Sequence, residues 1–418
     1  MEPLHPAPVV RRHRRALQLC FAIPGLSLAT WVTRTPDVRD RLGASTAEMG
    51  LVLFGMSIGS MLGILVAGAL VARFATRPVI LAGMGLVPAG VGTAALGAAT
   101  ASAPAVAAGL AFIGAGIGLS EVASNVDGAV VEGEFGRPVL PALHGCYSLG
   151  TVIGACLGVA GAVVGLPVSW HLTATLLLAA GLFACAVPGL RPGLGRAEPD
   201  PGAPPRGAGP GAGGSRGHRL LLDPRLLMIG GVVFGVTLAE GAATDWLPLL
   251  MVDGHGMPTG LGSAVYAGFA ATMAVGRFAG GPVVTRFGRP AVLGTGALLT
   301  AAGIALVSFV DVPAAAACAV LLWGLGTSLG FPLALSAAGE SGPDTTARIA
   351  LASRIGYVAL LAGPPLLGFL GEHQGLRAAM LPVMLLMLLA AVLSPATARD
   401  GAARRGRSRW QRLGLRNG

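Results

Sequence analysis

The residues best suited to chemistry are acidic side chains inside long apolar stretches of the sequence. Glu121 lies in the middle of one such stretch, and Asn125 follows four positions later. In a helix, that spacing places both side chains on one face. A carboxyl and an amide on one face can bind a hydroxylated solute and a proton together, because burial favours the protonated form of the carboxyl. We interpret Glu121 as a proton-binding residue; the alternative is a structural polar contact with a neighbouring helix.

A second pair of acids, Glu240 and Asp245, lies in a later apolar stretch. Five residues apart on a helix, their side chains point about 140° away from each other, so they cannot share one partner. Glu240 is the better candidate for a residue of a substrate cavity, against a packing role. Asp245, next to Trp246, belongs either to that cavity or to an aqueous outer vestibule.

Trp31 and Arg34 stand at the end of the first apolar stretch. Trp31 either stacks on a sugar ring or anchors the chain at the level of the lipid headgroups. Arg34 either binds substrate or pairs with Asp37 within the following loop.

His144, Tyr147 and Arg354 complete the candidate substrate and proton residues. His144 and Tyr147 are three positions apart and share a helix face. His144 either relays a proton from Glu121, since histidine titrates near physiological pH, or forms an interhelical hydrogen bond. A charge inside a helix needs a partner. The candidates for Arg354 are Glu121 and Glu240 in the cavity and Glu340 and Asp344 in a gate loop.

The composition indicates that these residues are held in a membrane. Of 418 residues, 53% are hydrophobic and 11% are charged, whereas a soluble domain carries about a quarter charged residues. A spanning helix needs about 20 apolar residues, so the chain has room for about twelve. The apolar runs are long rather than alternating, which predicts helices and not a barrel. An ionisable group at mid-bilayer costs about 2.5–3.5 kcal/mol, so the acids above are functional candidates.

The apolar runs predict an all-α membrane protein with twelve spanning helices in two six-helix bundles. The first bundle occupies residues 1–188, a linker rich in Pro, Gly and Arg follows at 189–224, the second bundle occupies 225–397, and a basic tail occupies 398–418. The predicted spans are 16–33, 46–71, 78–98, 103–128, 139–163 and 166–188, then 225–250, 259–285, 290–310, 313–338, 346–370 and 375–396.

The distribution of arginine predicts the orientation. With the N-terminus in the cytoplasm, the arginine-rich start, the linker and the basic tail all lie inside, and the arginines outside are Arg34, Arg39, Arg41 and Arg377. We therefore expect a multi-pass protein of the cytoplasmic membrane with both termini inside. The net charge of +10 then reflects loops beside anionic lipid rather than nucleic acid, and 5% aromatic residues are too few for a base-stacking surface.

Several function classes are not expected. The chain has no lysine, which excludes a GxxxxGK[ST] phosphate loop and Schiff-base chemistry. The five cysteines fall inside apolar segments, and the histidines do not cluster as metal ligands. No HExxH or GxSxG motif is present, so we expect neither an enzyme nor a metal or cofactor site. The energy source that we expect is the proton gradient.

An internal repeat supports two related halves. Gly63, Gly68, Arg73 and Phe74 recur 213 positions later as Gly276, Gly281, Arg286 and Phe287. Gly114 and Gly116 recur 210 positions later as Gly324 and Gly326. Repeats of this kind are typical of transporters with a site between two halves at mid-membrane.

The segment GRFAGGPVVTRFGRP at 276–290 resembles the G-x-x-x-D-R-x-G-R loop signature of the major facilitator superfamily, and GALVARFATR at 68–77 is a degraded copy. By this resemblance the gating-loop residues are Arg73, Arg77, Gly281, Arg286, Gly288 and Arg289. Five further segments resemble the fucose-permease-like branch of bacterial permeases: WVTRTPDVRDRLGASTAEMG, EVASNVDGAVVE, HGCYSLG, EGAATDWLPL and GPPLLGFLGEHQGLRAA.

The resemblance implies twelve helices in two pseudo-symmetric bundles, alternating access and frequent proton coupling, and it supports a proton role for Glu121. Two departures stand out. The acidic position of the loop signature is Ala72 in the first half and Thr285 in the second, and Phe331 stands at the repeat position of Glu121.

The leading hypothesis is a monomeric, proton-coupled secondary transporter of a small, sugar-like or otherwise polar solute. The alternative is proton-driven efflux of a drug or metabolite. A non-transporting membrane sensor or scaffold is more remote, because a scaffold would not require acids within its helices.

Overall fold

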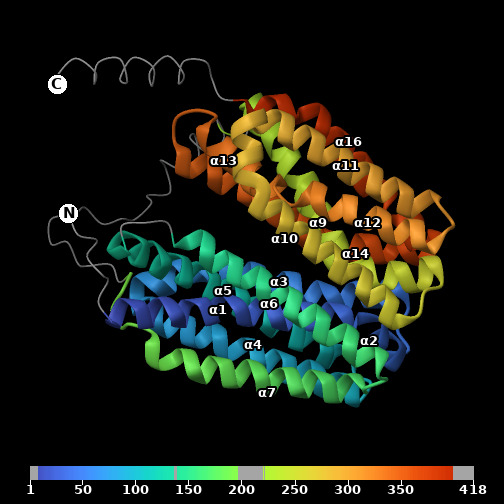
Figure 1. Cartoon of the computed structure of the whole chain (residues 1–418), viewed down its shortest axis with the longest axis horizontal. Helices are drawn as coiled ribbons and strands as arrows, with labels where there is room; N and C mark the ends of the chain where they lie inside the picture. Colours follow the sequence, from blue (N-terminus) through green and yellow to red (C-terminus); the bar gives the residue numbers. More distant parts are fainter. Residues whose placement is uncertain (1–7, 136–138, 196–219, 221, 399–418) are drawn as a thin grey trace.

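The structure is a computed structural model that describes residues 8–135, 139–195, 220 and 222–398. Every regular element in this part of the chain is a helix. The helices form two bundles that lie one above the other in Figure 1. We call the bundle of α1 to α7 the N-bundle and the bundle of α9 to α16 the C-bundle.

The N-bundle contains the six predicted spans. Its elements are α1 (Pro8–Thr33), α2 (Thr35–Leu42), α3 (Thr46–Phe74), α4 (Thr76–Ala99), α5 (Ala103–Phe135), α6 (Leu140–Val163) and α7 (Val168–Ala186), followed by the short η1 (Val187–Gly189).

The C-bundle begins at α9 (Pro224–His255). It continues with α10 (Thr259–Phe287), α11 (Arg289–Phe309), α12 (Pro313–Thr327), α13 (Gly330–Glu340), α14 (Thr345–Gln374), α15 (Leu376–Ala379), α16 (Leu381–Leu393) and η2 (Ser394–Thr397).

The predicted all-helical membrane fold is confirmed. In the described part of the chain, 11 segments are long and apolar enough to cross a membrane, with α12 and α13 counted as one span and α15 to η2 as another. The remaining predicted span, 259–285, corresponds to α10, whose glycines and arginines lower its hydropathy.

Three local features differ from the prediction. The helix α2 was not predicted; Pro36 stands in its first turn, and Gly43 ends it in the left-handed conformation with φ 59°. The tenth span is broken between α12 and α13, and the twelfth between α15 and α16. Proline explains both breaks, because Pro332 and Pro382 lack the N–H that would bond the carbonyl four residues earlier.

Within the N-bundle, α5 packs closely against α3 and α4 through glycine. A Cβ added at Gly59 would lie 2.0 Å from the carbonyl oxygen of Ala111, and one added at Gly90 would lie 2.5 Å from that of Gly109. These positions need glycine because the backbones nearly touch, as is typical of helices that pack in lipid.

The two bundles meet at the end of the molecule that carries α2, which we call the α2 end. There α3 lies against α14: Ser57 Oγ donates to the Leu360 carbonyl at 2.9 Å, and the Ala47 N–H donates to Glu372 at 3.2 Å. Arg39 on α2 also pairs with Asp253 on α9, across the two bundles. These contacts close the α2 end.

Candidate functional site

A cavity of about 920 Å³ lies between the bundles. Its lining comes from α1, α5 and α6 on one side and from α9, α10, α13 and α14 on the other. The lining reaches the first turns of α6 at Ala142 and of α14 at Ile349. These turns lie at the opposite end from α2, and we call it the η1 end. The cavity is therefore open toward the η1 end and closed by the contacts at the α2 end.

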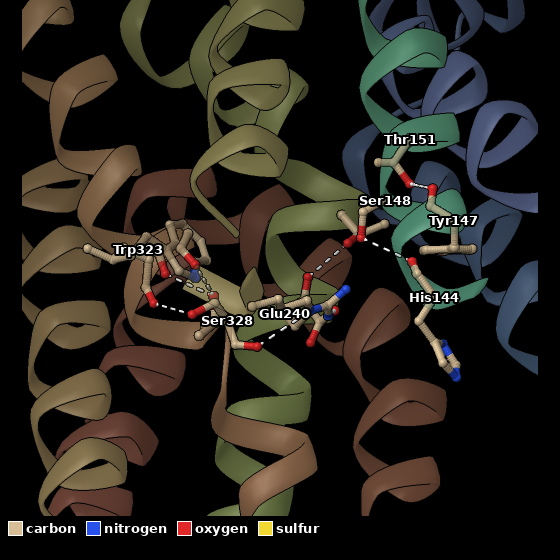
Figure 2. A network of polar contacts seen from close by, with 12 residues as sticks. His144, Tyr147, Ser148, Thr151, Glu240, Trp323 and Ser328 are labelled. Carbon is tan, nitrogen blue, oxygen red and sulfur yellow. Dashed lines mark hydrogen bonds and ion pairs between the residues drawn. The ribbon is translucent and has the colours of Figure 1, made fainter. Parts of the chain in front are cut away.

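Glu121 on α5 is the acidic residue of the N-bundle wall. Its side chain is exposed to the cavity, and it forms no ion pair or hydrogen bond with another side chain in the described part of the chain. His144 and Tyr147 on α6 line the same wall, and the His144 ring meets the Phe21 ring edge-on at 5.0 Å. Figure 2 shows His144 and Tyr147 on α6, across from Glu240 on α9.

Glu240 and Arg277 form the charged group of the C-bundle wall. Arg277 Nη2 lies 2.9 Å from Glu240 Oε1, and the two side chains are 35% and 29% exposed. Arg277 Nε also donates to the Ser328 carbonyl at 3.4 Å. That carbonyl is available because Pro332, four residues later, has no N–H. The break between α12 and α13 thus helps to hold Arg277 in place.

Arg277 was not among the residues singled out from the sequence, although the signal was there. It lies within the predicted span 259–285, and an ionisable residue inside a span is a functional candidate. Among the described lining residues it is the single arginine. Besides His144, the lining therefore carries two acids and one permanent cation.

Asn125 and Asp245 lie outside the lining of the cavity. Asn125 is half-buried one turn beyond Glu121 on α5, and Asp245 is half-buried on α9. The angular separation of Glu240 and Asp245 explains why one of them reaches the cavity and the other does not.

Trp31 and Arg34 lie within the closed α2 end rather than on the cavity. Both are 2% exposed. Arg34 Nε lies 2.6 Å from Asp37, and its Nη2 donates to the Leu166 carbonyl at 2.6 Å, so Arg34 joins the end of α1 to the α6–α7 loop.

Arg354 on α14 is exposed and outside the lining. Within the residues that the structure describes, it makes none of the four ion pairs considered above.

The gating-loop residues lie at the η1 end. Arg73 and Arg286 rest on the rings of Phe74 and Phe287, with the guanidinium carbon 5.1 and 5.4 Å from each ring centre. Arg289 binds Glu340 at 2.9 Å within the C-bundle. Gly288 has φ 81°, which favours glycine. Gly281 lies near the end of α10, and Arg77 lies in the first turn of α4.

The fold and the site together define a multi-pass membrane transporter: two helical bundles, a polar cavity between them, and closure at one end. The family model of the Major Facilitator Superfamily matches residues 19–352 and 263–413. The chain belongs to the major facilitator superfamily, whose members are transporters and not enzymes.

Relatives at the sequence level are transporters and membrane proteins of bacteria. An uncharacterised MFS-type transporter of Yersinia pestis is 33% identical over 91% of this chain and 95% of its own length. The membrane protein MosC of Rhizobium meliloti is 28% identical over 94% of this chain and 92% of its own.

Solved structures agree with the fold. A mutant form of the nucleoside transporter NupG gives a TM-score of 0.74 at 12% identity, covering 93% of this chain and 100% of that one. A mutant form of the Escherichia coli fucose:proton symporter FucP gives a TM-score of 0.62 at 18% identity, covering 93% and 98%. At these identities the likeness concerns the fold alone.

Proposed function

We propose that this transporter couples the movement of a small polar solute to protons, that Glu121 binds the proton, and that the chain lies in the cytoplasmic membrane with the η1 end inside. One observation carries the proposal. Glu121 faces the cavity without an ion-pair partner among the described residues, whereas Glu240 on the opposite wall is paired with Arg277. Glu121 is thus the acid of the cavity whose charge is neutralised by a proton and not by a neighbouring cation.

The physical argument concerns closure of the site. An ionised Glu121 without a cation costs free energy when water is removed from around it. A bound proton removes that cost and favours the closed, loaded state. In the empty carrier the proton must leave, and Arg277 is then the cation available within the same cavity to stabilise the carboxylate.

The lining also indicates the kind of solute. The rings of Phe21, Phe278 and Phe331 provide apolar contact, and the Ser148 hydroxyl and the acids provide polar contact. A mainly apolar pocket with a few polar groups suits a compact solute with both kinds of surface. A sugar-like ring with hydroxyl groups fits that description.

The apolar rings are also the observation that favours the second candidate, proton-driven efflux of a drug or metabolite. The two directions differ in the sign of proton movement. In proteoliposomes, a symporter alkalinises the medium outside as solute enters, whereas an exchanger acidifies the side from which solute is removed.

The test of Glu121 compares the wild type with Glu121→Gln in proteoliposomes, screening sugars, nucleosides, amino acids and drugs by counterflow. We expect the variant to retain counterflow exchange of the substrate and to lose accumulation driven by a pH gradient. Exchange does not require net proton movement, so it reports on folding and on substrate binding. If the Glu121→Gln protein still accumulates substrate under a pH gradient, Glu121 is not the proton-binding residue. Asp311→Asn, which removes a carboxyl that is 89% exposed and outside the cavity lining, is the matched control and should keep both activities.

A further inference from the structure

A histidine and a carboxylate outside the cavity are completely buried near the η1 end of the N-bundle. His13 on α1 and Asp127 on α5 are both 0% exposed, and His13 Nε2 lies 3.2 Å from Asp127 Oδ2. Among the described residues, His13 is the one ion-pair neighbour of this carboxylate, and no hydrogen-bond donor satisfies it. A buried carboxylate needs an opposite charge nearby, and His13 is the group that can supply one.

The other ring nitrogen of His13 contacts the start of the linker. His13 Nδ1 lies 3.2 Å from the Gly189 carbonyl oxygen and 3.3 Å from the backbone nitrogen of Arg191. Nδ1 donates only when it carries a proton and accepts only when it does not. In both states Nε2 carries a proton that faces Asp127. In the charged ring Nδ1 also carries a proton and donates it to the Gly189 carbonyl. In the neutral ring Nδ1 has no proton and accepts a hydrogen bond from the Arg191 N–H. The proton therefore decides which backbone group His13 holds.

An acid at the η1 end of the C-bundle offers a comparison within the same chain. Glu340 is the last residue of α13. Glu340 lies 2.9 Å from Arg289, and arginine keeps its charge at every accessible pH. Histidine changes charge between about pH 5 and 8. The two acids thus differ in partner: Glu340 contacts a permanent cation, and Asp127 contacts a titratable group.

The surrounding charges do not replace His13. Glu134 on α5 binds Arg191 Nη1 at 2.7 Å, which attaches the same stretch of linker at a second point. Arg14 rests on the Phe135 ring at 5.4 Å. None of the other charged or titratable groups on the elements packed around His13 bonds Asp127 in the described structure; they are Arg11, Arg12, Arg15 and Cys20 on α1, Arg77 on α4, Glu121 and Glu132 on α5, His144, Cys146 and Tyr147 on α6, and His171 and Cys185 on α7.

We propose that His13 and Asp127 form a second proton-binding site, separate from the transport cavity, that fixes the start of the interdomain linker. In the protonated state the imidazolium compensates Asp127 and donates to Gly189. Loss of the proton leaves a buried negative charge without compensation, and admission of water relieves that cost. Residues 187–195 are therefore held more tightly at lower pH.

Hydrogen exchange of the purified full-length protein tests this site directly. Exchange of the peptide covering residues 187–195 is followed from pH 5.5 to 8.5, with the intrinsic pH dependence of exchange removed by rescaling time. We expect protection of this segment to fall about tenfold between pH 5.5 and pH 8.5. The segment 340–345 begins at Glu340, which is paired with Arg289, and it serves as the internal control. Because arginine keeps its charge, protection of this segment should not change over the same pH range.

Two variants test the assignment to His13. His13→Gln should abolish the pH dependence and leave protection at its high-pH level, and Asp127→Asn should abolish or strongly reduce it. Tryptophan fluorescence melts establish that each variant is folded. If a variant does not fold, the wild-type protein still provides the test through the protection of segments 187–195 and 340–345. The proposal is overturned if protection of the two segments changes equally across the pH range. A folded His13→Gln protein that keeps the wild-type pH profile also overturns it.

Discussion

The pairing of Arg277 with Glu240 shows how one side chain sets the charge of the cavity. Arg277 reaches Glu240 at 2.9 Å and the Ser328 carbonyl at 3.4 Å. About a third of each side chain is exposed, so solvent screens the pair and its effect on stability is small. Its importance lies in the closed state, where water has left and an unpaired charge is costly.

This predicts an asymmetry between single and double substitutions. Glu240→Gln or Arg277→Gln alone leaves one uncompensated charge, and we expect counterflow rates to fall about tenfold or more. The double variant removes both charges and should recover part of the loss, unless each residue also binds substrate on its own. Initial rates of counterflow measure the effect.

Arg41→Gln, a change of an exposed arginine on α2, is the control and should keep the wild-type rate. A double variant slower than the product of the two single effects would contradict a simple charge pair.

At the scale of elements, the ends and breaks of helices position the functional side chains. Pro332 ends the regular hydrogen bonding of the tenth span, and the freed Ser328 carbonyl contacts Arg277. At the start of α9, Asp223 accepts hydrogen bonds from the Arg225 and Leu226 amides at 3.0 and 3.1 Å, and it lies 2.7 Å from Arg348 on α14. Asp223 thus ties the first turn of the C-bundle to α14.

Asp223 gives a pH-dependent prediction. Burial alone raises the pKa of Asp223, but hydrogen bonds from Arg348 and the two amides outweigh it and hold this pKa below its ordinary value. The stability from this group is therefore present above the unfolded pKa of about 3.9 and is lost as the pH falls through the lower folded value. Asp223→Asn should lower the melting temperature at pH 7, and the difference from wild type should shrink as the pH falls below about 4.

Asp311→Asn is the matched control for that experiment. Asp311 also bonds an arginine, Arg377, at 2.7 Å, but its side chain is 89% exposed. Solvent screening makes such a pair weak, so the control should melt close to wild type at pH 7. An Asp223→Asn protein that melts like wild type at neutral pH contradicts the argument.

At the scale of the whole molecule, the structure has one closed end and one open end. The closed end depends on a very close approach of α3 and α14: a Cβ added at Gly50 would lie 2.7 Å from the Pro364 carbonyl oxygen and 3.1 Å from the Gly368 Cα. These neighbouring atoms belong to the backbone, which cannot move aside as the end of a flexible side chain can. A larger residue at Gly50 must therefore separate the bundles at the α2 end.

We expect Gly50→Leu to shift the protein away from the conformation seen in Figure 1. Cysteines at Ala47 and Glu372, which are joined by a backbone-to-carboxylate hydrogen bond of 3.2 Å, report on closure in a background without the native cysteines. Their cross-linking should fall several-fold in Gly50→Leu.

Gly85→Leu is the control for the Gly50 experiment, because a Cβ added at Gly85 meets nothing within 4 Å. Its cross-linking should equal that of the parent protein. Unchanged cross-linking in Gly50→Leu would show that the α2 end opens and closes without the close contact at Gly50.

The sequence by itself determined the helical membrane fold and the family. Apolar run length is a property of the chain alone, and the helices observed follow it. The same reasoning identified Glu121, Glu240, His144 and Tyr147, which the structure brings to one cavity.

The tertiary structure decided which charges meet. Arg277 and Glu240 are 37 positions apart, and His13 and Asp127 lie on different helices, so no local pattern predicts either pair. Packing also buries Trp31 and Arg34 within the closed α2 end, and it places Asn125 and Asp245 outside the cavity lining. Helix periodicity assigns a face to each residue, but the rotation of each helix against its neighbours decides what that face meets.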